Sequence, residues 1–169
     1  MEFRRLTAAD AEAFRHLRLH GLKESPEAFS ADYDVSAALP LSHFAGRLHD
    51  AADNFVIGAC VDQQLIGVGG FYRDDGPKMR HKGTIWGVYV MPEHRRGGLG
   101  RRLIGEIISQ AALVPEVQQI NITVTAANER ARQLYLSMDF EPWGLERRAL
   151  WIDGRFYDDQ HMVLFLRRS

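Results

Sequence analysis

The chain has 169 residues, and its 21 lysines and arginines nearly balance 22 aspartates and glutamates, for a formal net charge of -1. This balance excludes a protein whose overall charge attracts nucleic acid or an anionic membrane. Hydrophobic residues make up 46% of the chain, which is ordinary for a soluble globular protein, and the length predicts a single domain over residues 1–169. The single cysteine, Cys60, excludes an intrachain disulfide and any site with several cysteine ligands.

Apolar segments are short throughout the sequence. The longest nearly unbroken one, Phe55 to Val61, is far below the roughly 18 residues that a membrane-spanning helix needs. Residues 1–5, Met-Glu-Phe-Arg-Arg, lack the apolar core of a secretory signal. We therefore expect a cytoplasmic protein with no membrane and no nucleic-acid partner, and we leave open whether it forms a homodimer.

The first third of the chain is predicted to be mainly helical. A short strand is expected from Phe3 to Leu6, and Thr7-Ala8-Ala9-Asp10 has the pattern of a helix N-terminus with a capping box. Ser25-Pro26 ends this helix. Residues 27–34 are expected to form a loop or broken helix, and a second helix is expected over about Leu41 to Leu48, after a proline.

The centre of the chain has the pattern of β-strands. Two apolar runs, Phe55 to Val61 and Leu65 to Arg73, are separated by three polar residues and predict a hairpin. A polar loop follows, and Lys82 to Met91 is the next predicted strand, since it is rich in aromatic and β-branched residues and ends before Pro92. Apolar residues at helical spacing then predict a helix that begins after residue 97 and ends near Leu113.

The last third alternates strands and helices. Residues 120–124 alternate apolar with polar side chains and predict a strand, and Glu129 to Met138 is expected to be a helix. Asp153-Gly154 is a strong hairpin signal between Ala149 to Ile152 and Phe156 to Leu166. The resulting order, β-α-α-β-β-β-α-β-α-β-β, predicts a mixed α/β fold with helices packed on a sheet.

Residues 88–102 are the most informative stretch, because a strand leads through a glycine-rich turn into an apolar helix. Glycines let the backbone approach a ligand, and the first N–H groups of a helix have no partner within the helix. Together with the helix dipole and four nearby arginines, they form an anion site that suits a pyrophosphate. The spacing is neither that of a nucleotide P-loop nor that of a dinucleotide fingerprint, since Leu103 occupies the third glycine position.

Two further patterns do not predict a functional site. His16 and His20 have a helical spacing that can hold a metal, but no third ligand is evident, so no metal site is predicted. Cys60 lies within an apolar strand and is interpreted as a small buried side chain rather than a nucleophile.

Two motifs resemble those of the GNAT superfamily of N-acetyltransferases. Arg95-Arg96-Gly97-Gly98-Leu99-Gly100 matches the signature (Gln/Arg)-x-x-Gly-x-(Gly/Ala), and Val90-Met91-Pro92-Glu93 precedes it, as is common in that family. Downstream, the family has a second motif, Asn-x-x-Ala-x-x-Leu-Tyr followed by Gly-Phe. This chain resembles it at Asn128, Ala131, Leu134, Tyr135 and Phe140. The resemblance runs over the whole chain in element order. It implies a single-domain, mostly antiparallel sheet with splayed central strands flanked by helices.

The resemblance also implies acetyl-CoA as co-substrate and assigns roles by position. Backbone amides of Arg96 to Arg101 would hold the pyrophosphate, and the pantetheine would pair with the splayed strand beside Val88 and Val90. Tyr135 is the expected general acid for the departing thiolate, although a simple core aromatic is the alternative; for Asn128 the alternative is a simple helix cap. The residues expected to bind the cofactor are Val88, Tyr89, Val90, Arg95, Arg96, Gly97, Gly98, Leu99, Gly100, Arg101 and Asn128.

The sequence departs from the family pattern at two places. Asp139 stands where the family usually has glycine, and we expect it to keep the left-handed turn. The strand Lys82 to Val90 has no aspartate or glutamate, whereas some relatives use a carboxylate there as general base. The base is therefore unassigned, with Glu27, Asp158, His161, a water chain or backbone carbonyls as candidates.

The resemblance places the acceptor pocket around Glu27, Phe29, Tyr33, Trp86 and Tyr157. The expected reaction is the direct attack of a small-molecule primary amine on the thioester, with a backbone N–H, that of Val88, polarising the carbonyl. Two alternatives remain: a protein N-terminal or lysine acetyltransferase, and an acyl-CoA-binding module without catalysis.

Overall fold

Eight strands form one sheet in the computed structural model, which describes residues 1–166. The strands are β1 (Glu2–Arg5), β2 (Asp50–Ala51), β3 (Asn54–Val61), β4 (Gln64–Arg73), β5 (Lys82–Val90), β6 (Gln119–Thr125), β7 (Glu141–Ile152) and β8 (Arg155–Phe165). Across the sheet their order is β1-β3-β4-β5-β6-β8-β7, and β2 pairs with β3. Among the described strand pairs, β5 and β6 run parallel and the others run antiparallel.

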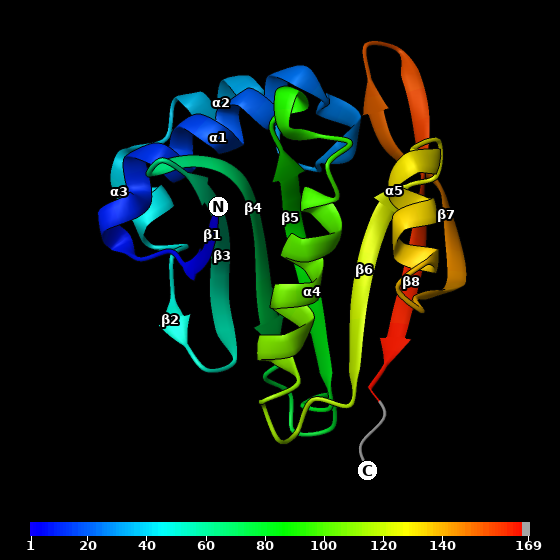
Figure 1. Ribbon diagram of the computed structural model, residues 1–169. Helices are drawn as coiled ribbons and strands as arrows, with labels where there is room; N and C mark the ends of the chain where they lie inside the picture. Colours follow the sequence, from blue (N-terminus) through cyan, green and yellow to red (C-terminus); the bar gives the residue numbers. More distant parts are fainter. Residues whose placement is uncertain (167–169) are drawn as a thin grey trace.

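Five α-helices flank this sheet in the described residues (Figure 1). They are α1 (Ala11–Glu24), α2 (Tyr33–Ala37), α3 (Leu41–Ala45), α4 (Leu99–Ala111) and α5 (Glu129–Leu136), with 3-10 turns at Ala8–Asp10, Pro26–Ala28 and Pro92–His94. The backbone N–H of Thr7 donates to the Asp10 carboxylate at 2.8 Å, which confirms the predicted capping arrangement before α1.

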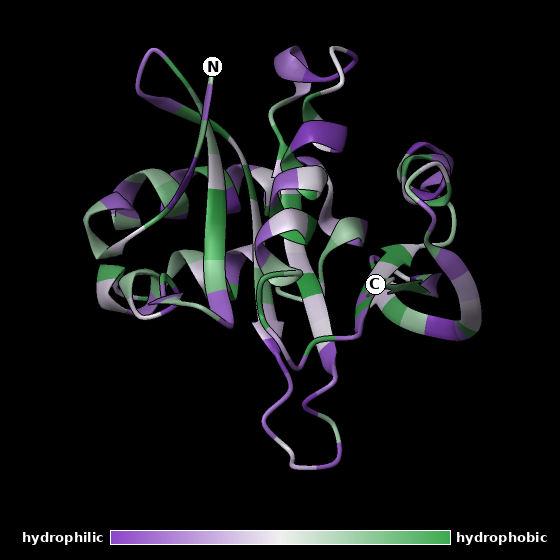
Figure 2. Cartoon of the chain, turned by 60° about the horizontal axis from the view of Figure 1, so that its bottom comes forward, coloured by the Kyte–Doolittle hydropathy of each residue, from purple (hydrophilic) through white to green (hydrophobic). Residues whose placement is uncertain are grey.

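The sheet is buried on both faces because successive residues of its central strands point to opposite sides. Ile57 packs with the buried side of α4, in a cluster that also contains Leu103 and Ile107. Its neighbour Val56 belongs to a second cluster that contains Phe14 of α1. Figure 2 shows the same arrangement, with hydrophobic residues along the strands and hydrophilic residues on the outer sides of the helices.

The parallel pair β5–β6 is only half formed. Its register runs from Lys82 opposite Gln119 to Ile85 opposite Ile122, and beyond that point the two strands diverge (Figure 1). On the other side of β5, the pairing with β4 shifts between Val68 and Gly70, at a bulge in which Gly87 adopts a left-handed φ of 63°. The second half of β5 thus has a backbone edge toward β6 that no described strand covers.

This architecture confirms the predicted mixed, mostly antiparallel sheet with splayed central strands flanked by helices. Four details differ from the expectation. The short helix α2 begins at Tyr33, inside the segment 27–34, the helix expected to reach Leu48 ends at Ala45, and β2 is an additional two-residue strand. In addition, β7 begins at Glu141 rather than Ala149, because an exposed edge strand with two register shifts lacks the regular alternation that marks a strand.

No helix in residues 1–166 is long and apolar enough to cross a membrane.

Candidate active site

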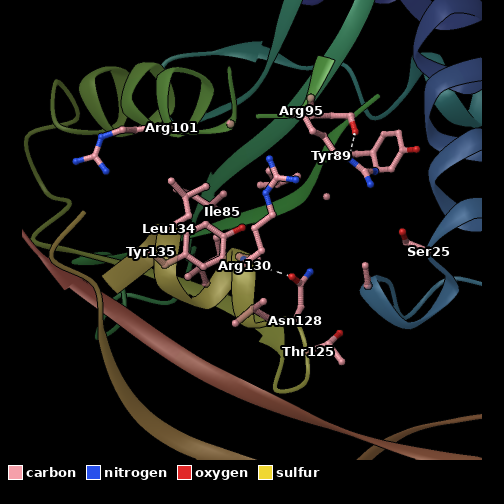
Figure 3. Close-up of a pocket in the computed structure, with 18 of the residues that line it drawn as sticks. Ser25, Ile85, Tyr89, Arg95, Arg101, Thr125, Asn128, Arg130, Leu134 and Tyr135 are labelled. Atoms are coloured by element: carbon pink, nitrogen blue, oxygen red, sulfur yellow. Dashed lines mark hydrogen bonds between the residues drawn. The ribbon is translucent and has the colours of Figure 1, made fainter. Parts of the chain in front are cut away.

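A cavity of about 340 Å³ opens where β5 and β6 separate (Figure 3). Its walls come from the uncovered half of β5, the end of β6, the turn before α4, and α5. Most of the residues predicted to bind the cofactor line it, together with the predicted catalytic tyrosine: Val88, Tyr89, Val90, Arg95, Arg96, Gly98, Leu99, Gly100, Arg101, Asn128 and Tyr135. Gly97 lies between two of these residues in the sequence and is exposed. The structure therefore brings together two motifs that lie about thirty positions apart in the chain.

The turn before α4 presents backbone N–H groups to this cavity. Gly98 is the N-cap residue with a left-handed φ of 75°, and Arg96 is left-handed as well, with a φ of 73°. The first helical hydrogen bond is donated by Arg102 to the carbonyl of Gly98, so the N–H groups of Leu99, Gly100 and Arg101 have no acceptor within the helix. Unpaired amides at the positive end of a helix dipole bind anions.

Positive charge dominates the wall of the cavity. Four arginines line it, namely Arg95, Arg96, Arg101 and Arg130. Figure 3 shows Arg130 extending from α5 into the cavity. No aspartate, glutamate or histidine within residues 1–166 is among the lining residues. Such a wall favours a ligand with several negative charges.

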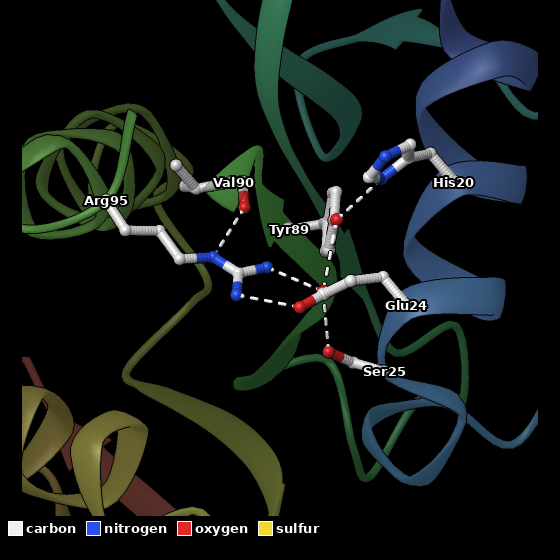
Figure 4. Close-up of polar contacts among 6 residues, drawn as sticks. All are labelled: His20, Glu24, Ser25, Tyr89, Val90 and Arg95. Carbon is white, nitrogen blue, oxygen red and sulfur yellow. Dashed lines mark hydrogen bonds and ion pairs between the residues drawn. The ribbon is translucent and has the colours of Figure 1, made fainter. Parts of the chain in front are cut away.

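Arg95 is held in place by a carboxylate from α1 (Figure 4). Its guanidinium donates to both carboxylate oxygens of Glu24, at 3.1 and 2.8 Å, and its Nε donates to the carbonyl of Val90 at 2.8 Å. The hydroxyl of Tyr89 donates to Glu24 at 3.2 Å and lies 2.8 Å from Nδ1 of His20. This network connects the end of β5 and the following turn to the last turn of α1.

Two members of this network, Glu24 and Tyr89, have shifted pKa values. The hydrogen bonds and charge of Arg95 lower the pKa of Glu24 to about 2, so its carboxylate has little affinity for a proton. Burial and the neighbouring Glu24 charge raise the pKa of Tyr89 to about 12, so its hydroxyl stays protonated. We therefore assign these two residues to the support of the turn.

Asn128 and Tyr135 both line the cavity from α5. The Oδ1 atom of Asn128 accepts a hydrogen bond from the N–H of Ala131 at 3.1 Å, so Asn128 caps the helix. Its amide NH₂ group is left as a donor toward the cavity. Tyr135 is buried and packs against Phe140, with ring centroids 5.8 Å apart, and burial raises its pKa. Both residues thus combine a structural contact with a place in the cavity wall.

The turn after α5 keeps its shape despite the missing glycine. Asp139 adopts the expected left-handed conformation with a φ of 65°, and the N–H of the next residue, Phe140, donates to the carbonyl of Tyr135 at 3.1 Å. The prediction for this position is confirmed.

The residues expected around the acceptor fall into two groups. Phe29 and Trp86 line the cavity at its end near α1, whereas Glu27, Tyr33 and Tyr157 do not line it. The Tyr33 ring instead lies 5.7 Å from the ammonium of Lys23, and the Tyr157 ring lies 5.1 Å from the guanidinium of Arg155. Of the five residues expected around the acceptor, all of them in the described part of the chain, only Phe29 and Trp86 therefore line the cavity between β5 and β6.

The three candidate bases also lie outside the cavity wall. Glu27 contributes its backbone carbonyl, which accepts a hydrogen bond from the Thr125 hydroxyl. The Asp158 carboxylate accepts from the N–H of Arg148 at 2.8 Å, and Nε2 of His161 lies 3.2 Å from the carboxylate of Glu146. Among residues 1–166, no group of three or more histidine, cysteine or acidic side chains is placed to hold a metal ion.

Some lining residues were not found from the sequence. They include Ser25 and Ala28 from the end of α1 and the following turn, Thr125 from β6, and Arg130 from α5. Arg130 lies two positions after Asn128 in the second motif. An arginine at the start of that helix could therefore have indicated a further contact to an anionic ligand. The positions of Ser25 and Ala28 depend on tertiary packing, which no local pattern records.

A family model described as the Acetyltransferase (GNAT) family matches residues 16–140. The chain belongs to this family. Among curated proteins, it is 28% identical to the uncharacterised N-acetyltransferase YoaA of Bacillus subtilis over 57% of this chain and 52% of YoaA, so it spans about half the length of that relative. It is also 24% identical to spermidine N(1)-acetyltransferase of Vibrio cholerae over 73% of this chain and 72% of that protein.

Solved structures share the GNAT fold with this chain. An acetyltransferase of the family from Streptococcus pneumoniae superposes with a TM-score of 0.83 at 22% identity, over 98% of this chain and 99% of the other. YncA, a putative acetyltransferase from Salmonella typhimurium solved with acetyl-CoA, superposes with a TM-score of 0.81 at 21% identity, over 100% of this chain and 95% of the other. At these identities the similarity establishes the fold.

Proposed function

We propose that the protein is an acetyl-CoA-dependent N-acetyltransferase that transfers the acetyl group to a primary amine of a small molecule. One observation carries this proposal. The uncovered edge of β5 and the arginine-rich turn before α4 open into the same cavity, with Asn128 and Tyr135 on its opposite wall.

The parts of acetyl-CoA match the parts of this cavity. The pyrophosphate fits the turn from Arg95 to Arg101, where unpaired amides and arginine side chains supply positive charge. The pantetheine arm carries amide groups that can pair with the free backbone edge at Val88 to Val90, as an added strand does. Asn128 also lines the cavity, and its amide NH₂ group would serve as a further donor to the arm.

The proposed reaction is a direct transfer. The lone pair of the neutral amine forms a bond to the thioester carbonyl carbon, and the C–S bond breaks with the electron pair moving to sulfur. Negative charge develops on the carbonyl oxygen meanwhile, and a backbone N–H aimed at this oxygen stabilises it. We assign this role to Val88, since it follows the bulge at Gly87 on the uncovered half of β5.

Tyr135 is proposed as the proton donor to the departing sulfur. Its raised pKa keeps the hydroxyl protonated throughout the physiological range. Full proton transfer to a thiolate is therefore uphill, but a hydrogen bond that strengthens as charge builds on sulfur lowers the barrier.

The amine proton has no carboxylate or imidazole to receive it among the described lining residues. We propose that water removes it and that the amine reacts in its neutral form. The rate should then rise with pH until the bound amine is deprotonated.

A small-molecule acceptor is supported by the aromatic side chains of Phe29 and Trp86 in the cavity wall and by the similarity to a spermidine acetyltransferase. We place the enzyme in the cytoplasm, where acetyl-CoA is available.

The experiment that tests this function measures free thiol release from acetyl-CoA in the presence of a panel of primary amines. Amine-dependent release, with the N-acetylated amine identified by mass spectrometry, supports the proposal. Tight binding of acetyl-CoA without release for any amine or amine-bearing peptide would instead indicate a binding module.

A further inference from the structure

A second cavity, of about 350 Å³, has Arg18 of α1 in its wall. The guanidinium carbon of Arg18 lies 4.9 Å from the centre of the Phe29 ring and 5.9 Å from that of Trp86. Both rings line the first cavity, at its acceptor end. Arg18 itself lines the second cavity. It therefore stands between the place of acetyl transfer and a further space enclosed by α1, residues 30–36 and α3.

Arg18 carries a charge that nothing nearby compensates. Its Nη1 atom is buried and has no hydrogen-bond partner in the described part of the chain. Burial, together with repulsion from Arg47, lowers the pKa of Arg18 to about 10, so the group is still cationic at neutral pH. A buried cation without a paired anion is unfavourable unless a ligand supplies the anion.

A second guanidinium lies at the same cavity. Arg47 lines it, and its guanidinium carbon lies 4.3 Å from the centre of the Trp86 ring. Desolvation lowers the pKa of Arg47 as well. Neither Arg18 nor Arg47 forms an ion pair within residues 1–166, although eight other ion pairs occur there. Two cations therefore flank one aromatic ring without an acidic partner.

The one carboxylate in the wall of this cavity is committed elsewhere. Asp32 accepts a hydrogen bond from the N–H of Val35 at 2.9 Å and caps α2. His43 is the remaining titratable side chain of the wall. The wall of this cavity thus offers cationic donors, and within residues 1–166 its carboxylate caps α2 and forms no ion pair with either arginine.

We propose that Arg18 and Arg47 bind an oxyanion of the acceptor, so that the substrates are primary amines that also carry a carboxylate or phosphoryl group. This inference rests on the proposed function and adds the chemical class of its acceptor. Guanidinium groups bind such oxyanions with paired, charge-assisted hydrogen bonds. The aromatic rings of Phe29 and Trp86 hold the guanidinium of Arg18 in position through cation–π contacts.

The position of Arg18 also serves the reaction. A Cβ atom placed on Gly87 would lie 2.9 Å from Nη1 of Arg18, so the guanidinium reaches the bulge of β5 next to Val88. An oxyanion bound there holds the amine of the same molecule near the thioester.

The test compares four matched acceptors: an amino acid, its uncharged amide, the corresponding aminoalkyl phosphonate, and a diamine of similar length. Their kcat/KM values are measured with acetyl-CoA for the wild type, Arg18→Met, Arg47→Met and the control Arg80→Met, which removes an exposed arginine from the loop before β5. The wild type and the control should prefer an anionic amine over the amide by at least tenfold. The amino acid and the phosphonate together show whether the favoured anion is a carboxylate or a phosphoryl group.

Arg18→Met and Arg47→Met should each remove most of this preference, because kcat/KM should fall far more for the anionic amines than for the amide, while the KM for acetyl-CoA should change little. Arg47 is more exposed than Arg18, so its variant tests the inference even if Arg18→Met does not fold. A wild type that uses the amide as well as both anionic amines overturns the inference. So does a loss in Arg18→Met that is equal for all four acceptors.

Calorimetric titration of the same four compounds in the presence of CoA gives a readout that needs no turnover. Binding of an anionic amine to the wild type but not to Arg47→Met supports the oxyanion site even if no acetyl group is transferred, in which case the proposed function fails and the site stands. Binding of neither anionic amine overturns the site, while acetylation of the amide or the diamine would still support a transferase.

Discussion

Arg95 and Glu24 lie 71 positions apart in the sequence and form an ion pair through both carboxylate oxygens, at 3.1 and 2.8 Å (Figure 4). The pair fastens the turn before α4 to the end of α1. Glu24, which supplies the carboxylate, is not part of any motif in the sequence. The shape of the proposed phosphate site thus depends on a helix that contributes nothing to the turn itself.

Replacing Glu24 by glutamine should loosen this turn. The charge of Arg95 would lose its partner, and we expect the dissociation constant for acetyl-CoA to rise several-fold, with little change in kcat because Glu24 does not line the cavity. Glu12→Gln, an equal change of charge at an exposed position of α1, is the matched control. Equal affinity in the two variants, measured by titration calorimetry, would show that the pair has no role in the turn.

The same pair predicts a pH dependence of stability. The pKa of Glu24 is about 2 in the folded protein, against an ordinary value of 4.5. A depressed pKa stabilises the fold above pH 4.5, and this contribution is lost as the pH falls toward 2. Because the pair is partly exposed, its contribution should be below about 1 kcal/mol. Denaturant unfolding of Glu24→Gln should therefore show a flatter loss of stability between these pH values than the wild type.

Replacing Gly98 by valine should weaken acetyl-CoA binding by at least tenfold, or about 1.4 kcal/mol. A β-branched residue strains the left-handed φ of 75° and places a side chain where the backbone amides meet the phosphates. No neighbouring atom lies within 4 Å of a Cβ at this position, so the core is not disturbed. Gly105→Ala, in the middle of α4 and also without a close neighbour, controls for the stability of the helix. Unchanged affinity in a folded Gly98→Val protein would remove the turn from the phosphate site.

Tyr135→Phe keeps the ring and its contact with Phe140 but deletes the proton. We expect kcat to fall at least tenfold, within the usual range for general acid catalysis, while the affinity for acetyl-CoA stays nearly the same. The measurement is a single-turnover rate, because product release can hide a slower chemical step. A phenylalanine variant with the wild-type rate would leave Tyr135 as a packing residue only.

Substitutions of Trp86 or Phe29 should change the acceptor KM more than a substitution of Tyr33 does. Trp86→Ala removes part of the cavity wall and should raise the acceptor KM more than the KM of acetyl-CoA. Tyr33→Ala changes a ring that lies against Lys23 outside this wall, so its effect on the acceptor KM should be smaller. The order of the two effects is checked by steady-state kinetics at saturating acetyl-CoA. The reverse order would place the acceptor against the Tyr33 ring and not against Trp86.

Local signals explain why much of this fold could be predicted from the sequence. Burial on both faces makes β3 and β4 continuous apolar runs, and the helix α4 follows its glycines at regular apolar spacing. Strand β7 was predicted only in part, because Pro142 and Gly144 interrupt it and both of its register shifts lie in its irregular first part. Helix α2 has only five residues, too few for a periodic pattern.

The residues of the site likewise fall into those that a local motif predicts and those that only the fold brings together. The turn at Gly98 and the helix that carries Asn128 and Tyr135 are contiguous motifs, so their residue types were visible in the chain. Glu24, Arg18 and Arg47 act through contacts between distant elements. Only the folded chain shows that Glu24 pairs with Arg95 and that neither Arg18 nor Arg47 forms an ion pair within residues 1–166. Tyr33 and Tyr157 were expected at the site from the segments that carry them, but the direction of a side chain depends on packing.

The central claim is that this cavity transfers an acetyl group from acetyl-CoA to an amine. The most direct measurement follows an isotopically labelled acetyl group on acetyl-CoA after incubation with the enzyme and the preferred amine. The account predicts that the label appears on the amine nitrogen in an amount equal to the thiol released, and that Tyr135→Phe slows both equally. Thiol release without labelled amine, or acetyl-CoA that binds and stays intact with every amine, would contradict it.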